Sequence, residues 1–236
     1  MRRDVLARLR RDLAEKRPAV LATRLASGDA RLLHPFDDEP GGHPALRAAA
    51  RQAALEDRSQ VVPTPEGEVF LRVFNPPVRV IVVGAVHVAQ ALAPMVRQAG
   101  YDVLVVDPRR SFATADRFPG ITVSAEWPDE AMARVGVDRR TAVVTMTHDP
   151  KIDDPALVGA LRSESFYVGA LGSKKTQAAR RERLRGKGFS DADVARIRGP
   201  VGLPLGAVSP GEIAVSILAE LVGALRRPAG SERAGA

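Results

Sequence analysis

The sequence predicts an α/β fold: a doubly wound, mostly parallel sheet preceded by a small α+β domain. From Val78 onward, short apolar runs rich in β-branched residues alternate with helical stretches. These runs are apolar at consecutive positions, which fits strands covered by helices on both faces. Before Val78 the pattern is that of a small α+β domain instead. Pro76-Pro77, which lies at the change, can continue neither a helix nor a strand ladder. We therefore expect two domains, over residues 1–75 and 76–236.

The first of these, residues 1–75, has the pattern of a small α+β domain. Val5, Leu9 and Leu13 recur at helical spacing, so an amphipathic helix is expected over 3–17. The strand-like segments "AVLATRL" and "ARLLH" flank an "SGD" turn, and "HPALRAAARQAALEDR" has a helical pattern. After the turn "PEGE", the segment "EVFLRVF" is predicted to be a strand.

The second domain, residues 76–236, alternates strands and helices. Strands are expected within 78–83, 101–107, 121–128, 140–146 and 165–171, and helices within 87–100, 129–137, 154–163 and 173–188. Right-handed crossovers between them give a doubly wound sheet, whose ligand crevice lies at the carboxyl ends of the strands.

The last helix begins at "SPGE", where Ser209 can cap, Pro210 occupies the first turn and Glu212 completes a capping box. Its apolar stripe is expected to pack on the sheet or at a homodimer interface; the stripe comprises Ile213, Ile217, Leu221 and Ala224. The final segment "RRPAGSERAGA" is expected to fray.

Composition excludes several classes of function. The 236 residues are 45% hydrophobic, enough for a sizeable core, and contain no cysteine, so disulfides and thiol chemistry are excluded. The net charge of +7 suggests nucleic acid, but aromatic residues make up 4% and no nucleic-acid-binding motif occurs. Neither a membrane-spanning apolar run nor a secretion signal is present. We expect a cytoplasmic protein that binds neither nucleic acid nor membrane.

The turn after the first strand of the second domain resembles a dinucleotide-binding fingerprint, G-x-G-x-x-G/A, without its middle glycine. The three fingerprint positions are Gly84, Val86 and Ala89. A β-branched residue thus stands where the pyrophosphate normally approaches the backbone. The backbone amides around this helix start, including those of Ala85 and His87, still favour an anion. We therefore expect a Rossmann-like fold that still binds an anion but whose ligand differs from the usual dinucleotide.

The second strand of this domain ends at Asp107, 23 residues after Gly84. In this fold an acidic residue there accepts hydrogen bonds from a ribose diol, and Arg109 nearby suits a phosphate instead. Asp107 could equally be a turn residue of "DPRR", and both interpretations remain open.

Two further segments follow predicted strands at the same edge. Thr147, His148 and Asp149 come after one strand, and a histidine there can exchange a proton near neutral pH or simply orient the loop. "GALGSKKT" follows the next strand, so the amides near Gly172 and Ser173, with Lys174 and Lys175, suit a phosphate or carboxylate. Alternatively, the lysines lie on a solvated helix end.

No other constellation carries chemistry. The carboxylates are scattered without metal-ligand spacing, and no Ser/His/Asp nucleophile arrangement occurs, so we assign neither metal-binding nor catalytic residues. From the residues alone an NAD(P)-dependent oxidoreductase remains an alternative, with Asp107 or Arg109 at the adenosine ribose and His148 as acid or base.

Six segments taken in order resemble the C-terminal Rossmann domain of the XdhC/CoxI family, over roughly residues 70–225. They are "VIVVGAVHVAQALAP", "VVDPR", "FATADRFP", "TMTHDPKIDDPAL", "FYVGALGSKKT" and "GLPLGAVSPGEIAVSILAEL". The resemblance implies a xanthine dehydrogenase accessory protein rather than an enzyme. Such a chaperone binds the molybdenum cofactor, as molybdopterin or its dinucleotide form. It protects the cofactor while a cysteine desulfurase supplies the sulfido ligand, and delivers it to a molybdenum hydroxylase apoenzyme such as xanthine dehydrogenase or carbon monoxide dehydrogenase.

The same resemblance implies cofactor-binding residues in four segments. These are Gly84, Ala85, Val86 and His87; Asp107 and Arg109; Thr147, His148 and Asp149; and Gly172, Ser173, Lys174 and Lys175.

Overall fold

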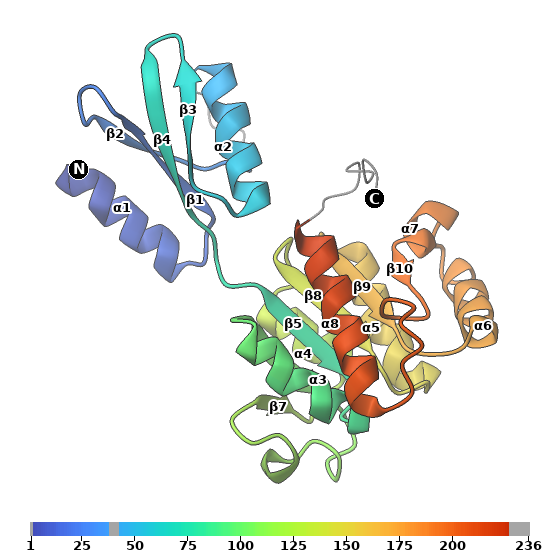
Figure 1. Cartoon of the computed structure of the whole chain (residues 1–236). Helices are drawn as coiled ribbons and strands as arrows, with labels where there is room; N and C mark the ends of the chain where they lie inside the picture. Colours follow the sequence, from blue (N-terminus) through green and yellow to red (C-terminus); the bar gives the residue numbers. More distant parts are fainter. Residues whose placement is uncertain (1, 38–42, 227–236) are drawn as a thin grey trace. The chain divides into compact units, whose positions relative to one another are not determined.

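The computed structural model describes residues 2–37 and 43–226, and contacts between residues divide the chain into two compact units, Met1–Pro76 and Pro77–Ala236. Fraying is expected over residues 226–236; Arg226 is helical in the structure, and residues 227–236 lie outside the described part. Figure 1 labels the helices and strands of each unit.

The first unit is an antiparallel sheet with one helix on each face (Figure 1). Along the chain it comprises α1 (Arg3–Ala14), β1 (Ala19–Arg24), β2 (Ala30–Leu33), α2 (Pro44–Glu56), β3 (Gln60–Thr64) and β4 (Gly67–Phe74), with strand order β2-β1-β4-β3. Val20 and Ala22 of β1 pack with α2, whereas Ala19, on the opposite face, packs with α1. The alternation of side chains along β1 thus supplies both cores.

Strand β3 escaped the sequence prediction because Pro63 interrupts its pattern. The strand lies at the edge of the sheet and pairs only with β4 among the strands described. A proline is tolerated there, since one side of an edge strand needs no ladder hydrogen bond. The helices and the other strands of this unit lie where the sequence places them.

The second unit is built on a sheet of six parallel strands in the order β10-β9-β8-β5-β6-β7. The strands are β5 (Arg79–Val83), β6 (Asp102–Val106), β7 (Thr122–Ser124), β8 (Thr141–Thr145), β9 (Tyr167–Ala170) and β10 (Ile197–Arg198). Numbered from β5, this is the 3-2-1-4-5-6 order of a Rossmann fold, and its topological switch point lies between β5 and β8. The predicted fold class is confirmed.

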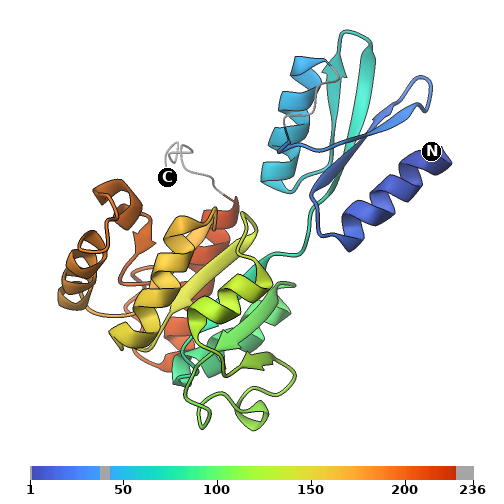
Figure 2. The ribbon, with the colours of Figure 1, turned by 180° about the vertical axis from the view of Figure 1, so that it is seen from behind.

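Helices cover both faces of this sheet. On one face lie α3 (His87–Gln98) and α8 (Pro210–Arg226), seen in front in Figure 1. The other face carries α4 (Pro128–Val135), α5 (Pro150–Arg162), α6 (Lys174–Arg185) and α7 (Asp191–Ala195), better seen in Figure 2. Alternate residues of β5 separate the two cores: Val80 and Val82 pack with α3, whereas Ile81 and Val83 pack with α5.

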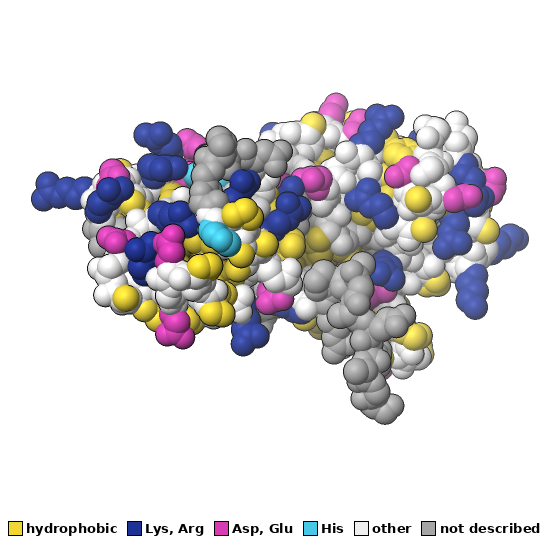
Figure 3. Space-filling model, turned by 90° about the horizontal axis from the view of Figure 1, so that it is seen from above, with side chains coloured by type: hydrophobic (Ala, Val, Ile, Leu, Met, Phe, Trp, Pro, Cys, Tyr) yellow, Lys and Arg dark blue, Asp and Glu magenta, His cyan; other side chains and the backbone are white. Residues whose placement is uncertain are grey.

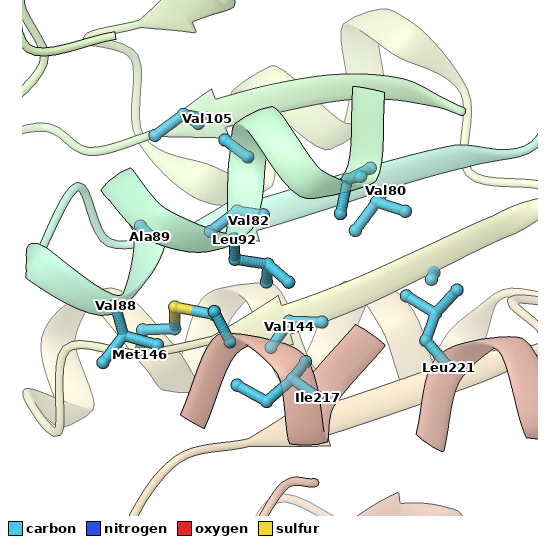
Figure 4. Packing of buried hydrophobic residues seen from close by; sticks show 14 of the residues in the cluster. Val80, Val82, Val88, Ala89, Leu92, Val105, Val144, Met146, Ile217 and Leu221 are labelled. Carbon is cyan, nitrogen blue, oxygen red and sulfur yellow. The ribbon is translucent and has the colours of Figure 1, made fainter. Parts of the chain in front are cut away.

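The last helix packs as its apolar stripe predicts. Ile217 and Leu221 of α8 are fully buried against the sheet and α3, in the cluster drawn in Figure 4. The capping box is also present, because Ser209 accepts a hydrogen bond from the Glu212 amide at 3.2 Å and Glu212 accepts one from the Ser209 amide at 2.8 Å. The intramolecular contact accounts for the stripe without a second copy of the chain.

Three short elements were not predicted, namely α7, β10 and the 3₁₀ turn η1 (Ala115–Arg117). Each is too short to show a hydrophobic period, so the sequence carries little signal for it. None of the described helices has the length and apolarity that a bilayer crossing requires. On the face drawn in Figure 3, basic side chains are scattered among acidic and neutral ones rather than gathered in one patch.

Candidate functional site

The four predicted segments all follow parallel strands, so the sheet brings them to one edge, here called the carboxyl edge. Gly84–His87 follows β5, Asp107–Arg109 follows β6, Thr147–Asp149 follows β8 and Gly172–Lys175 follows β9. In an open α/β sheet this edge, at the switch point, is where ligands bind. Neighbouring segments also touch one another.

Gly84 joins the first and third segments. Its φ is +106°, and a Cβ added there would lie 2.5 Å from Cγ2 of Thr147. Both conditions exclude a side chain, because other residues rarely adopt that backbone angle and the approach is shorter than any ordinary contact. The glycine of the altered fingerprint therefore keeps the β5 and β8 turns close together.

Asp107 joins the first and second segments. Its carboxylate is fully buried and accepts hydrogen bonds from the amides of Ala85 (2.8 Å) and Arg109 (3.0 Å) and from the Arg109 guanidinium (2.9 and 2.7 Å). Burial alone would raise the pKa of Asp107, but these hydrogen bonds outweigh it and lower the pKa. Of the two interpretations of Asp107, its hydrogen bonds in this structure are those of a turn residue.

Thr147, His148 and Asp149 form a tight turn over a buried carboxylate. Asp153, 1% exposed, accepts hydrogen bonds from the Thr147 hydroxyl (2.7 Å) and the His148 amide (3.1 Å). His148 adopts a φ of 65°, and its exposed ring lies near Gly172, where an added Cβ would be 3.4 Å from Nδ1. Asp149 caps α5 by accepting from the Lys151 amide at 2.9 Å.

Asp153 in turn pairs with Arg180 of α6, whose side chain is 2% exposed, at 3.2 Å. The same guanidinium donates to the carbonyl of Leu171 (3.2 Å) and to Gln177 (2.6 Å). Burial raises the pKa of Asp153, with the hydrogen bonds and Arg180 offsetting this only in part, and burial likewise lowers the pKa of Arg180. This ion pair connects the turn after β8 with the loop after β9.

Sequence reasoning missed both members of this pair. Asp153 lies in the quoted segment "TMTHDPKIDDPAL", where its spacing from Thr147 gave a weak signal of a side chain folding back on the turn. Arg180 stands among other arginines in "QAARRERLR", a pattern typical of a solvated helix. Only the packing of α6 distinguishes it from its neighbours.

In the loop after β9, part of the hydrogen-bonding capacity is used by the loop itself. The Ser173 hydroxyl accepts from the Thr176 amide at 3.2 Å, which caps α6, and Gly172 has a φ of +134°. Lys174 and Lys175 are exposed at the start of the helix. Their charges, rather than the capped helix start, are what this segment offers to an anion.

The start of α3 differs from those of α5 and α6. Its N-cap residue is Val86, whose side chain makes no capping hydrogen bond, and its first turn contains no acidic residue. Val86 is half-buried and packs against the core cluster beneath α3. The amides at the start of this helix are thus left for an anion, which the helix dipole also favours.

Among the residues that the structure describes, no group of three or more His, Cys, Asp or Glu is placed to hold a metal ion. The fold and the edge together define a Rossmann-type domain with a modified dinucleotide turn, followed by a helix start that has no side-chain cap. The XdhC Rossmann domain model matches residues 80–221. The chain therefore belongs to the XdhC family.

Several known proteins resemble this chain. The molybdenum cofactor insertion chaperone PaoD of Escherichia coli is 33% identical over 148 residues, 63% of this chain and 40% of that protein. A Bacillus subtilis protein named as a probable xanthine dehydrogenase subunit is 30% identical over 162 residues, 68% of this chain and 47% of the relative. An uncharacterised Escherichia coli protein, YqeB, is 30% identical over 65% of this chain and 28% of its own length. The chain thus spans less than half the length of these curated relatives.

Among solved structures, the crystal structure of a xanthine dehydrogenase from Bacillus halodurans superposes with a TM-score of 0.68 and 23% identity. The match covers 98% of this chain and 66% of the other. At this level of identity the likeness concerns the fold alone.

Proposed function

We propose that this protein is a molybdenum-cofactor-binding accessory protein, which holds the cofactor at the carboxyl edge and delivers it to a molybdenum hydroxylase. The observation that carries the proposal is the uncapped start of α3 beside a modified dinucleotide turn. Membership of the XdhC family and the similarity to a protein named as a molybdenum cofactor insertion chaperone support it.

The cofactor in either of its forms, molybdopterin or a dinucleotide, carries phosphate, and the edge suits phosphate at three places. The amides at the start of α3 can donate to its oxygens, and the dipole of the helix favours its charge. Arg109 and the pair Lys174 and Lys175 add positive charge from the neighbouring segments. We propose that Gly84 to His87 contact the phosphate and that His148 and Thr147 line the same edge.

In this proposal the cofactor is cargo, and the chain only binds and shields it. The sequence contains no cysteine, so the chain has no thiol with which to carry sulfur. The terminal sulfido ligand would therefore come from a partner, for which a cysteine desulfurase is the expected class. The second partner is the hydroxylase apoenzyme, which is of the xanthine dehydrogenase or carbon monoxide dehydrogenase type.

The competing proposal is an NAD(P)-dependent oxidoreductase, which the 3-2-1-4-5-6 strand order favours. Two features oppose it. Asp107, the residue in position to receive a ribose diol, already accepts four hydrogen bonds from within the chain. Val86 replaces the glycine at which the pyrophosphate approaches most closely.

The first test is equilibrium binding of molybdenum cofactor to the purified protein under anoxic conditions, with NADH and NADPH as competitors. A Lys174→Ala/Lys175→Ala variant is measured alongside. We expect binding that the nicotinamide nucleotides do not displace and that the variant weakens by about 10-fold, as for loss of two charge-assisted contacts of roughly 0.7 kcal/mol each.

A matched control is Arg181→Ala/Arg185→Ala, which removes the same charge from the exposed face of α6 further from its start. It should leave the affinity within about 2-fold of that of the unmodified protein. Binding of NAD(P)H without retention of the cofactor would overturn the proposal in favour of the oxidoreductase.

A further inference from the structure

The loop after β6 carries a stack of one aromatic ring and two guanidinium groups. The Cζ atom of Arg109 lies 4.2 Å from the centre of the Phe112 ring, and that of Arg117 lies 5.2 Å from it. Both distances are within the range of cation–π attraction. We call these three residues the Arg109–Phe112–Arg117 stack.

The stack is held in place by hydrogen bonds at both ends. Arg109 is fixed by Asp107, which also binds the Ala85 amide in the fingerprint turn. Arg117 donates to the Phe112 carbonyl at 2.9 Å and to the Gln90 side chain of α3 at 3.1 Å. The stack is therefore attached to both the turn and the helix that offer the phosphate site.

Phe112 is exposed where a structural phenylalanine would be buried. Its exposed fraction is 36%, whereas Phe118, six residues later in the same loop, is 2% exposed and packs in the core cluster under α3. Because the hydrophobic gain scales with the buried apolar area, Phe112 gains less from burial than Phe118 does. The core of the loop is thus supplied by Phe118, and the position of Phe112 needs another explanation.

Part of the Arg109 guanidinium is free to contact a ligand. Its Nε and Nη2 atoms donate to Asp107 and its Cζ atom lies over the Phe112 ring, while its side chain is 38% exposed. Nη1 has no hydrogen-bond acceptor among the described residues. A planar group can lie against the open face of the guanidinium or the exposed part of the ring, and a carbonyl oxygen can accept from Nη1.

We propose that the Arg109–Phe112–Arg117 stack is the subsite for a planar nitrogen heterocycle joined to the phosphate that binds at α3. The inference rests on the proposed function and adds which part of the ligand the loop after β6 receives. Stacking on aromatic and guanidinium planes tolerates different bases, because every heterocycle offers a π face. A pterin and the nucleobase of a dinucleotide share this chemistry, so the experiment has an arm for each.

The experiment is isothermal titration of the full chain at low salt with pairs of phosphate ligands, of which one member carries the ring and the other does not. Cytidine 5′-monophosphate and ribose 5-phosphate form the nucleobase pair; 6-hydroxymethylpterin diphosphate and inorganic pyrophosphate form the pterin pair. We expect the ring to strengthen binding by about 10-fold in at least one pair, as for one stacked base. The pair with the larger gain identifies which ring the subsite receives.

Three variants test whether the increase in affinity that the ring provides depends on Phe112. Phe112→Ala should reduce the gain to less than about 2-fold, and Phe112→Leu, which keeps an apolar side chain without a ring, should do the same. Phe112→Trp should retain it. Because Phe112 is partly exposed, all three are expected to fold, which thermal unfolding checks.

The outcomes separate the two proposals. Ring-bearing and ring-free ligands that bind the unmodified chain equally, or a gain that survives in Phe112→Ala, would overturn the heterocycle subsite and leave the phosphate site standing. Failure of all four ligands to bind the unmodified chain would overturn both.

Discussion

Two buried aspartates hold the turns of the carboxyl edge, and they differ in the arginine that each one binds. Asp107 and Asp153 are both almost completely shielded from solvent, and each accepts backbone amides from the turn it supports. The side chain of Arg109, the partner of Asp107, is 38% exposed, whereas that of Arg180, the partner of Asp153, is 2% exposed. The pKa is lowered at Asp107 and raised at Asp153.

This difference separates a pair that can take part in binding from one that can only support it. The solvated guanidinium of Arg109 costs little to keep charged, so Asp107 ionises readily and Arg109 can also meet a ligand. Arg180 and Asp153 lose their hydration together, and their attraction must offset two desolvation penalties. We infer that the pair on the β8 side fixes the spacing of two loops, whereas the pair on the β6 side presents a cation to the edge.

The largest effect is expected at the enclosed pair. Arg180→Met should lower the free energy of unfolding by about 3–5 kcal/mol, because it leaves the Asp153 carboxylate buried without its counterion. Urea unfolding followed by circular dichroism measures this. The double variant Asp153→Asn/Arg180→Met keeps an acceptor for the turn without the buried charge, so it should recover part of the loss. An unchanged urea midpoint for Arg180→Met would show that Asp153 has no need of its partner.

A smaller, pH-dependent effect is expected at the open pair. Asp107→Asn should cost about 1–3 kcal/mol at pH 7, since two amides and Arg109 lose a charged acceptor. The folded protein lowers the pKa of Asp107 below its ordinary value of 3.8, so its contribution is present above that value and is lost as the pH falls. The difference between the variant and the unmodified protein should therefore shrink below about pH 4. A difference that grows on acidification would contradict the assignment.

The smallest effect concerns the helix starts beside the two pairs, because α5 is capped by Asp149 and α3 has no side-chain cap. Val86→Thr preserves the shape of the side chain and adds a capping hydroxyl, so it should stabilise the fold by about 0.5–1 kcal/mol. It should also weaken inorganic pyrophosphate binding several-fold by occupying an amide. Thermal unfolding and titration measure the two effects. Asp149→Ala is the matched control for stability and should cost about 1 kcal/mol. Unchanged pyrophosphate affinity in Val86→Thr would argue against a phosphate at α3.

Most of the architecture could be predicted from local patterns. Consecutive apolar residues such as Val80 to Val83 mark strands covered on both faces, and the alternation with helices implies parallel pairing. The capping box at Ser209 and Glu212 located the last helix within a residue. The exception among the longer elements is β3, where Pro63 resembles a break unless the strand is known to lie at an edge.

The location of the candidate site could be predicted from the sequence, but its hydrogen bonds and ion pairs could be predicted only in part. Parallel strands must end at one edge, so the segments after β5, β6, β8 and β9 were expected to meet there. The role of Asp107 stayed undecided, since a free carboxylate and one that binds its own turn have the same sequence. That the start of α3 has no side-chain cap, while Ser173 and Asp149 cap their own helices, became visible only from the hydrogen bonds.

By itself, the sequence determined the layers of the fold, the edge at which the four candidate segments meet and the family to which the chain belongs, because these depend on periodicities and motifs among chain neighbours. Asp107 and Arg109, two residues apart, lie within the reach of such local information. Asp153 and Arg180 are separated by 27 residues, and only the packing of α6 against α5 and the sheet brings them together. Burial of a charge depends on everything packed around it, so the tertiary structure decided which arginine is enclosed as a support and which remains open to a ligand.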